Sequence, residues 1–216
     1  PLWKERLYSI QCTFSPDGKK LLVQGGPSAF GKQGENIGKH RVANQYDVQL
    51  YIYDLKTRQA DAITRNFDPS VESAYWHKNG KIYIKVTEAD FVRLYRYGDG
   101  RFTRIDCPGD LILQTSYAQD AEEMMYTASN TNYPPRIYTL NLNSLQAELW
   151  ENPAQEQYRN IVFGEMKDWD YQYKKGSLID GRYYLPADFD PQKKYPLIVY
   201  YYGGTTPVAR SFGGRW

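Results

Sequence analysis

The chain has 216 residues, of which 41% are hydrophobic and 24% are charged, a composition that excludes a disordered or collagen-like protein. Lys and Arg exceed Asp and Glu by only 27 to 25, so charge gives no reason to expect nucleic acid as a partner. The longest apolar run, residues 197–202, is far shorter than the roughly 20 residues that cross a bilayer, so we expect no membrane-spanning segment. The chain opens on Pro1 rather than Met, from which we expect a piece of a longer protein.

The aromatic and sulfur-containing residues favour β structure without a metal. There are 21 Tyr, 8 Phe and 5 Trp, and flat aromatic rings pack well across a pleated sheet. Cys12 and Cys107 lie in unrelated surroundings and lack the Cys-x-x-Cys spacing of metal and redox motifs. We therefore expect buried free thiols rather than a disulfide, no metal site and no cofactor.

A strand–turn–strand sequence pattern recurs along the chain, and a tyrosine-rich strand follows each copy. The copies have their strands at 8–14 and 21–23, at 73–76 and 82–86, and at 115–117 and 124–127, with the tyrosine-rich strands at 50–55, 94–97 and 137–140. Tyr51 and Tyr95 are 44 residues apart, and Tyr95 and Tyr138 are 43 apart. A period of about 40 to 45 residues with about four short strands is typical of β-propeller blades. The alternative is a plain meander with accidental similarity.

The repeats predict a mainly β protein with a partial β-propeller of about three blades. Three blades cannot close a ring, because propellers have about four to eight. Unpaired strand edges would then remain, and these favour pairing with another copy of the chain. A homo-oligomer is therefore one expected assembly.

The first repeat contains a glycine-rich insertion at about residues 26–45. Gly38-Lys39-His40 superficially resembles a phosphate loop, but no hydroxyl residue follows the lysine and no helical pattern comes after it. We therefore expect no nucleotide site. The insertion is interpreted as a flexible surface loop, of the kind that sometimes reaches toward a ligand or partner.

The pattern changes after Pro153, which predicts a domain boundary between residues 155 and 165. The expected division is a partial propeller over 1–160 and a second domain over 161–216. In the second domain, the almost wholly apolar run 195–204 is typical of a strand buried on both faces of an α/β sheet.

This segment resembles the opening of the catalytic domain of the prolyl oligopeptidase family of serine peptidases, particularly its dipeptidyl peptidase IV-like members. The matching residues are, in order, Asp180-Gly181, Tyr184-Leu185-Pro186, Phe189-Asp190-Pro191, Lys194-Tyr195-Pro196-Leu197 and Tyr202-Gly203-Gly204. The resemblance implies a propeller followed by an α/β-hydrolase domain, release of dipeptides from short peptides, often after proline, and a periplasmic or secreted enzyme. It also matches Tyr202 to an oxyanion-hole residue, whose phenol would donate a hydrogen bond to the tetrahedral intermediate.

The chain shows no complete Ser-His-Asp triad. No G-x-S-x-G string occurs, and we interpret Ser211 as a loop serine. Neither His40, in the inserted loop, nor His77, in a blade turn, stands where the family's base would. Glu122-Glu123 resembles the family's amine-binding pair only in being adjacent, so we interpret it as solvated turn charge.

Two functions from different classes remain open at this point. The first is a piece of a serine peptidase, inactive alone because its triad lies downstream. The second is a noncatalytic β-propeller that binds a protein partner.

Overall fold

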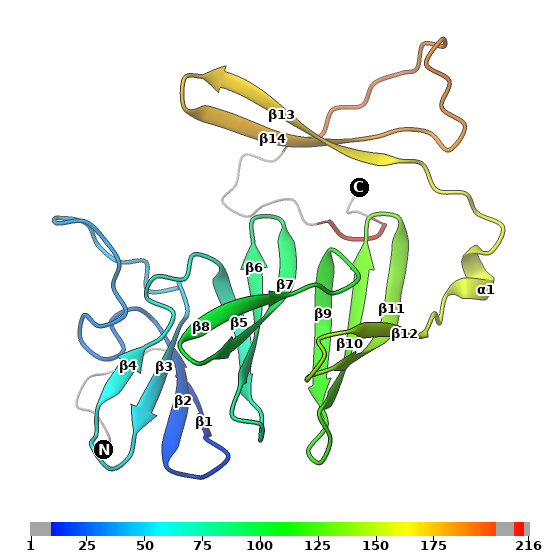
Figure 1. Ribbon diagram of the computed structural model, residues 1–216. Helices are drawn as coiled ribbons and strands as arrows, with labels where there is room; N and C mark the ends of the chain where they lie inside the picture. The colour runs from blue at the N-terminus through cyan, green and yellow to red at the C-terminus, as the bar shows by residue number, and fades with distance from the viewer. Residues whose placement is uncertain (1–9, 202–209, 214–216) are drawn as a thin grey trace.

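The computed structural model describes residues 10–201 and 210–213, and nearly all of its regular structure is β-strand. Figure 1 shows three groups of strands standing side by side, with a separate two-stranded hairpin beyond their ends. The mainly β class predicted from the aromatic content is confirmed.

Each of the three groups is an antiparallel meander of four strands paired in chain order. The first contains β1 (Gln11–Phe14), β2 (Lys20–Gly25), β3 (Gln49–Asp54) and β4 (Ala60–Ala62). The second contains β5 (Ser70–Trp76), β6 (Ile82–Glu88), β7 (Phe91–Gly98) and β8 (Arg101–Ile105). The third contains β9 (Leu111–Tyr117), β10 (Glu123–Asn130), β11 (Tyr133–Asn141) and β12 (Ala147–Glu151).

These meanders are propeller blades rather than one continuous sheet. The second and third are joined by a single parallel pair, Val92 with Leu111. Elsewhere they meet through side chains, as neighbouring blades do. Three four-stranded blades confirm the predicted repeat and the partial propeller.

The recurring turn has the same backbone pattern in the first two blades. The amide of Gly18 donates to the carbonyl of Ser15 (2.9 Å), and the amide of Gly80 donates to the carbonyl of His77 (3.0 Å). Both glycines have positive φ, 69° and 80°, which residues with a Cβ rarely adopt. The glycine that ends the recurring turn in the sequence is therefore explained by a turn geometry that the two blades share.

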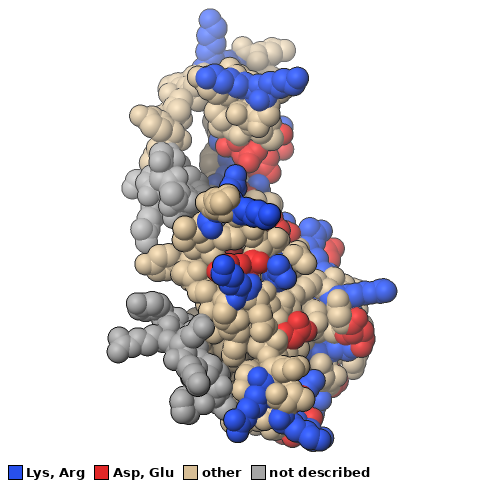
Figure 2. Space-filling model, turned by 90° about the vertical axis from the view of Figure 1, so that its left-hand side faces the viewer, with Lys and Arg blue, Asp and Glu red and all other residues tan. Residues whose placement is uncertain are grey.

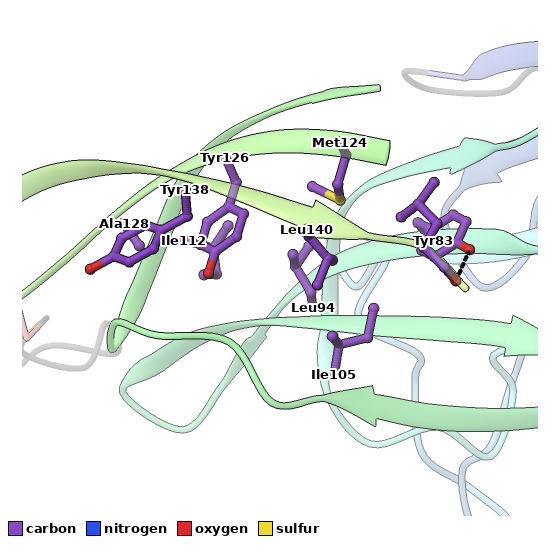
Figure 3. Close-up of a cluster of buried hydrophobic side chains, with 10 residues drawn as sticks. Tyr83, Leu94, Ile105, Ile112, Met124, Tyr126, Ala128, Tyr138 and Leu140 are labelled. Carbon is purple, nitrogen blue, oxygen red and sulfur yellow. Dashed lines mark hydrogen bonds between the residues drawn. The ribbon is translucent and has the colours of Figure 1, made fainter. Parts of the chain in front are cut away.

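Buried side chains between the blades form the main cores. The core between the first and second blades contains Leu22, Leu50, Val71, Ile82, Ile84 and Val86. The core between the second and third blades, drawn in Figure 3, contains Tyr83, Leu94, Ile105, Ile112, Met124, Tyr126, Ala128, Tyr138, Leu140 and Leu142. Alternate residues of a strand point to opposite faces, so Ile82 and Ile84 face the first blade while Tyr83 faces the third. Strand β6 is thus buried on both sides.

The insertion between β2 and β3 is not simply a flexible surface loop. The ring of Phe30 lies 5.0 Å from that of Tyr51 and 5.6 Å from that of Tyr53. The Tyr51 hydroxyl is placed to donate to the carbonyls of Gly26 (2.8 Å) and Pro27 (2.9 Å). The first turns of the loop therefore cover the apolar face of the first blade that points away from the second, which would otherwise meet water.

The remaining elements are one helical turn, α1 (Gln155–Tyr158), and a hairpin of β13 (Met166–Lys174) and β14 (Ser177–Tyr184). The blade strands end before the expected boundary and the hairpin begins after it. The buried strand expected from residue 195 onward is not formed over 195–201, where Leu197 is 84% exposed and Ile198 is 87% exposed. No strand of the described residues pairs with this run, so its backbone has no ladder to join and neither face is covered.

The two cysteines are free, but only one is sheltered. Cys107 is half-buried, whereas Cys12 is exposed. Cys12 stands on β1, which forms the edge of its sheet among the described residues. The expectation that both thiols are buried is therefore wrong for Cys12.

Candidate functional site

Tyr202, the expected oxyanion-hole donor, lies outside the described residues, so its position is not part of this structure. The structure next describes the chain at Arg210, eight residues later. Arg210 is buried at the centre of an ionic cluster at the junction between the blades and the hairpin. Figure 1 shows residues 210–213, in red, between the blade ends and the hairpin.

Arg210 pairs with three aspartates and is only 7% exposed. Its Nε donates to Oδ2 of Asp90 (2.9 Å), and its Nη2 donates to Oδ1 of Asp168 (2.8 Å). Its Nη1 lies 3.8 Å from Oδ2 of Asp110, close enough for an ion pair but too far for a hydrogen bond. Separate nitrogens that donate to separate carboxylates fix the orientation of the planar guanidinium.

The three aspartates come from three different parts of the fold. Asp90 lies in the tight turn between β6 and β7, which Ala89 makes with a φ of 54°. Asp110 immediately precedes β9 of the third blade, and Asp168 lies on β13 of the hairpin. A single side chain therefore connects the second blade, the third blade and the hairpin.

One aromatic ring and two further arginines complete the cluster. The Cζ of Arg210 lies 4.0 Å from the ring centroid of Phe91, and the Cζ of Arg93 lies 3.9 Å from the same centroid. Nη1 of Arg182, on β14, lies 3.5 Å from Oδ2 of Asp90. Three arginines thus offset three aspartates. We call these seven residues the Arg210 cluster.

Burial and pairing act in opposite directions on the charged groups of the Arg210 cluster. Desolvation by itself lowers the pKa of Arg210, but the hydrogen bond to Asp168 and the charges of Asp90 and Asp110 outweigh it, so the pKa is raised. Desolvation raises the pKa of Asp110, and the charges of Arg210 and Arg93 offset only part of that rise. Arg210 is therefore held in its charged form.

The sequence alone does not reveal this cluster, because its members are far apart along the chain. Arg210 is separated from Asp90 by 120 residues and from Asp168 by 42. None of these residues stands in a motif. The only local signal is that Arg210 is the one charged residue among the small and apolar residues of 207–213.

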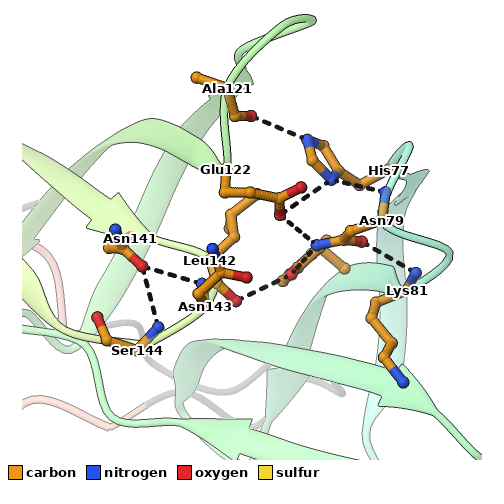
Figure 4. Close-up of polar contacts among 10 residues, drawn as sticks. His77, Asn79, Lys81, Ala121, Glu122, Asn141, Leu142, Asn143 and Ser144 are labelled. Atoms are coloured by element: carbon orange, nitrogen blue, oxygen red, sulfur yellow. Dashed lines mark hydrogen bonds and ion pairs between the residues drawn. The ribbon is translucent and has the colours of Figure 1, made fainter.

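His77, the histidine in the turn before β6, is buried rather than available as a base (Figure 4). Its Nδ1 accepts a hydrogen bond from the backbone amide of Asn79 (3.2 Å), so the ring proton is on Nε2. That nitrogen donates to the carbonyl of Ala121 in the third blade (3.2 Å). Both ring nitrogens are thus used, Nδ1 within the turn of the second blade and Nε2 in joining that blade to the third.

Glu122 belongs to the same junction, so its interpretation as solvated turn charge is wrong. Its Oε2 accepts a hydrogen bond from Nδ2 of Asn79 (2.7 Å) and lies 3.7 Å from Nδ1 of His77. The turns of two neighbouring blades pack against each other here, which the separate turns in the sequence do not reveal. Glu123, by contrast, is exposed at the start of β10.

The described residues do not assemble a Ser-His-Asp triad. Ser211 and His40 are both exposed. Across residues 10–201 and 210–213, no serine hydroxyl is hydrogen-bonded to His40 or to His77. The interpretation of Ser211 as a loop serine agrees with its exposure.

Charge and possible metal ligands were the remaining signals for a site in the part of the chain that the structure describes. On the face drawn in Figure 2, positive and negative side chains are interspersed with uncharged ones. Within the described ranges, no group of three or more His, Cys, Asp or Glu is arranged to hold a metal ion. In the same part of the chain, no helix is long and apolar enough to cross a membrane.

Known proteins resemble this chain in sequence and in fold, although no family model matches it. It is 21% identical over 225 residues to dipeptidyl-peptidase 5 of Porphyromonas gingivalis, a match that covers 97% of this chain and 29% of that protein. The acylaminoacyl peptidase of Pyrococcus horikoshii aligns with a TM-score of 0.63 and 21% identity, over 89% of this chain and 28% of that one. A puromycin hydrolase aligns with a TM-score of 0.51 and 15% identity, over 82% of this chain and 25% of that one.

The chain spans less than a third of the length of each of these relatives. The two structural likenesses concern the fold, and they agree with the blades described above. The sequence match runs through both the blades and the C-terminal segment in which the family motifs stand. The chain is therefore similar in sequence to a dipeptidyl peptidase along nearly its whole length, and it contains part of a β-propeller.

Proposed function

We propose that this chain forms propeller blades and the opening of the catalytic domain in a serine peptidase that releases dipeptides from short peptides, often after proline. The observation that carries the proposal is the match to dipeptidyl-peptidase 5 along 97% of the chain. The motif in this chain that ends in Tyr202-Gly203-Gly204 supports it. In this function the phenol of Tyr202 donates a hydrogen bond to the oxyanion of the tetrahedral intermediate. A backbone amide beside the nucleophile supplies the second donor.

The nucleophile, base and acid of this reaction come from residues outside the chain. The engagement of both ring nitrogens of His77 and the exposure of Ser211 support this assignment. So does the length of the relative, of which the chain covers only 29%. The isolated chain is therefore expected to leave peptide substrates intact.

The blades would restrict access to the catalytic domain. A propeller that stands before a hydrolase domain admits peptides through limited openings, which favours short substrates over folded proteins. The Arg210 cluster supports such an arrangement, because it ties the blade ends to the segment that follows Tyr202-Gly203-Gly204.

The test is an assay of the full-length protein on dipeptides coupled to a fluorescent amine, some with proline and some with alanine at the second position. The same peptides with a blocked amino group serve as controls for dipeptide release. We expect hydrolysis of the free dipeptides, slower hydrolysis of the blocked ones, and covalent labelling by a fluorophosphonate, which reacts with activated serine. If the protein shows neither hydrolysis nor labelling, the proposal is refuted, and a noncatalytic propeller that binds a protein is favoured instead.

A further inference from the structure

A polar pocket lies on the second blade, at the end of β7 opposite to the Arg210 cluster. Its volume is about 300 Å³, at the lower end of the range for small-molecule sites. Strand β7 begins at Phe91, which contacts Arg210, and runs to Gly98 at the pocket, an extended length of about 23 Å. The residues that line the pocket come from the position before β6, from β7 and β8, and from the turn between these two strands: Lys81, Arg96, Gly98, Asp99, Arg101 and Thr103. We call it the β7–β8 pocket.

Strand pairing places the basic side chains of β7 and β8 on one face of the blade. Arg96 is paired with Thr103, and Gly98 is paired with Arg101. Directly opposed residues of antiparallel strands point to the same face of the sheet. The face is the one that points toward the third blade, because Tyr83 also opposes Arg96 and is buried in the core between these two blades.

Gly98 gives the pocket its shape. A Cβ at this position would collide with Cδ of Lys81, so the lysine side chain crosses β7 at a residue that has no side chain of its own. Nζ of Lys81 then donates to Oδ2 of Asp99 (2.6 Å). The backbone amide of Lys81 donates to Oδ1 of Asn79 (3.0 Å), which fixes the start of this side chain (Figure 4).

The β7–β8 pocket has an excess of positive charge. Three cations and one carboxylate line it, and the carboxylate, Asp99, is paired with Lys81. Among the described residues, no carboxylate lies within ion-pair distance of Arg96 or Arg101. The hydrogen bond from Lys81 lowers the pKa of Asp99, and the charges of Lys81, Arg96 and Arg101 lower it further. The local field therefore favours negative charge.

We propose that the β7–β8 pocket binds a phosphate group, either free or carried by a small soluble molecule. A phosphate dianion matches the two positive charges that Asp99 leaves unbalanced. Guanidinium groups donate in pairs to phosphate oxygens, and the Thr103 hydroxyl offers a further donor. The volume equals that of about ten water molecules in the liquid, which is more than a phosphate group alone occupies. The binding does not depend on the proposed peptidase function.

The experiment titrates the full-length protein with inorganic phosphate and with glycerol 3-phosphate in a calorimeter. Acetate at the same ionic strength is the control for a singly charged anion. We expect one saturable site for phosphate and at least roughly tenfold weaker binding of acetate. Tighter binding of glycerol 3-phosphate than of inorganic phosphate would identify an organic phosphate as the preferred ligand, and equal or weaker binding would identify phosphate itself.

Variants of the lining residues should change the affinity in opposite directions. Arg96→Gln and Arg101→Gln should each weaken phosphate binding by roughly tenfold or more, because each removes charge-assisted hydrogen bonds. Asp99→Asn should strengthen it by roughly threefold to tenfold, because it removes a negative charge beside the ligand and frees Lys81. Asparagine suits the positive φ of 52° at this turn position, so the hairpin should keep its fold. A gain in affinity cannot result from misfolding.

Arg104→Gln is the matched control on the same strand. Arg104 opposes Tyr95, which packs into the core facing the first blade, so its side chain starts on the other face of β8. This variant removes the same charge and should bind phosphate like the parent. Equal weakening in Arg104→Gln and Arg101→Gln, as general electrostatic attraction would give, would overturn the proposal. The absence of saturable phosphate binding in both the parent and Asp99→Asn would also overturn it. Loss of peptidase activity would not alter these results, because binding is measured without turnover.

Discussion

The hydroxyl of Tyr51 should hold the long loop of the first blade in place. Tyr51 is fully buried, and its hydroxyl reaches the carbonyls of Gly26 (2.8 Å) and Pro27 (2.9 Å). Tyr51→Phe removes one oxygen and keeps the ring contact with Phe30. The two carbonyls then lose the hydroxyl but keep the amides of Ala29 and Gly34 as donors, so the closed loop should weaken by about 0.5 to 1.5 kcal/mol, the usual net contribution of a hydrogen bond.

Hydrogen exchange measures this loss directly. The amide of Ala29 donates to the carbonyl of Gly26 (3.0 Å), so it exchanges only when the loop opens. In Tyr51→Phe we expect it to exchange roughly two to 13 times faster, which is the predicted range of free energy converted to a rate ratio. Tyr46→Phe, at a side chain that is 93% exposed in the same loop, is the control and should change nothing. Equal exchange in the two variants would refute the anchoring role of Tyr51.

Two further predictions concern the blade core and the cysteines. Leu140→Ala, at a fully buried position between the second and third blades, should lower the free energy of unfolding by about 2 to 5 kcal/mol in a denaturant titration; an unchanged midpoint would contradict the described packing. Desolvation raises the pKa of Cys107 to about 12, so its thiol stays protonated at pH 8, whereas Cys12 is exposed. Iodoacetamide should therefore modify Cys12 first and Cys107 only on unfolding, and equal rates would show that Cys107 is not sheltered.

The blades could be predicted because their signals are local. A turn that ends in a glycine with positive φ, as at Gly18 and Gly80, is visible as a pattern of consecutive residues in the sequence. The alternation of a half-buried strand is visible in the same way. The last strands of the first and third blades carry no such signal. Strand β4 has only three residues, and the last four residues of β12 are exposed, so neither carries a clear alternation.

The features that the sequence did not reveal depend on contacts between distant residues. The Arg210 cluster joins residues up to 120 positions apart, and Glu122 meets Asn79 across 43 positions. The covering role of the long loop depends on the apolar face beneath it, which becomes a surface only once the first blade has folded. Likewise, the apolar composition of 195–201 favours a strand, but a strand needs a neighbour, and no described strand pairs with this run.

The kcat of Tyr202→Phe in the full-length protein tests the proposed peptidase function most directly. An oxyanion donor stabilises charge that exists only in the transition state, so we expect kcat to fall by roughly 10²- to 10³-fold with little change in KM. Tyr200→Phe and Tyr201→Phe make the same change at neighbouring positions and should keep the parental kcat. A normal kcat in all three variants, or a loss in Tyr202→Phe that is explained by unfolding, would contradict the oxyanion role of Tyr202.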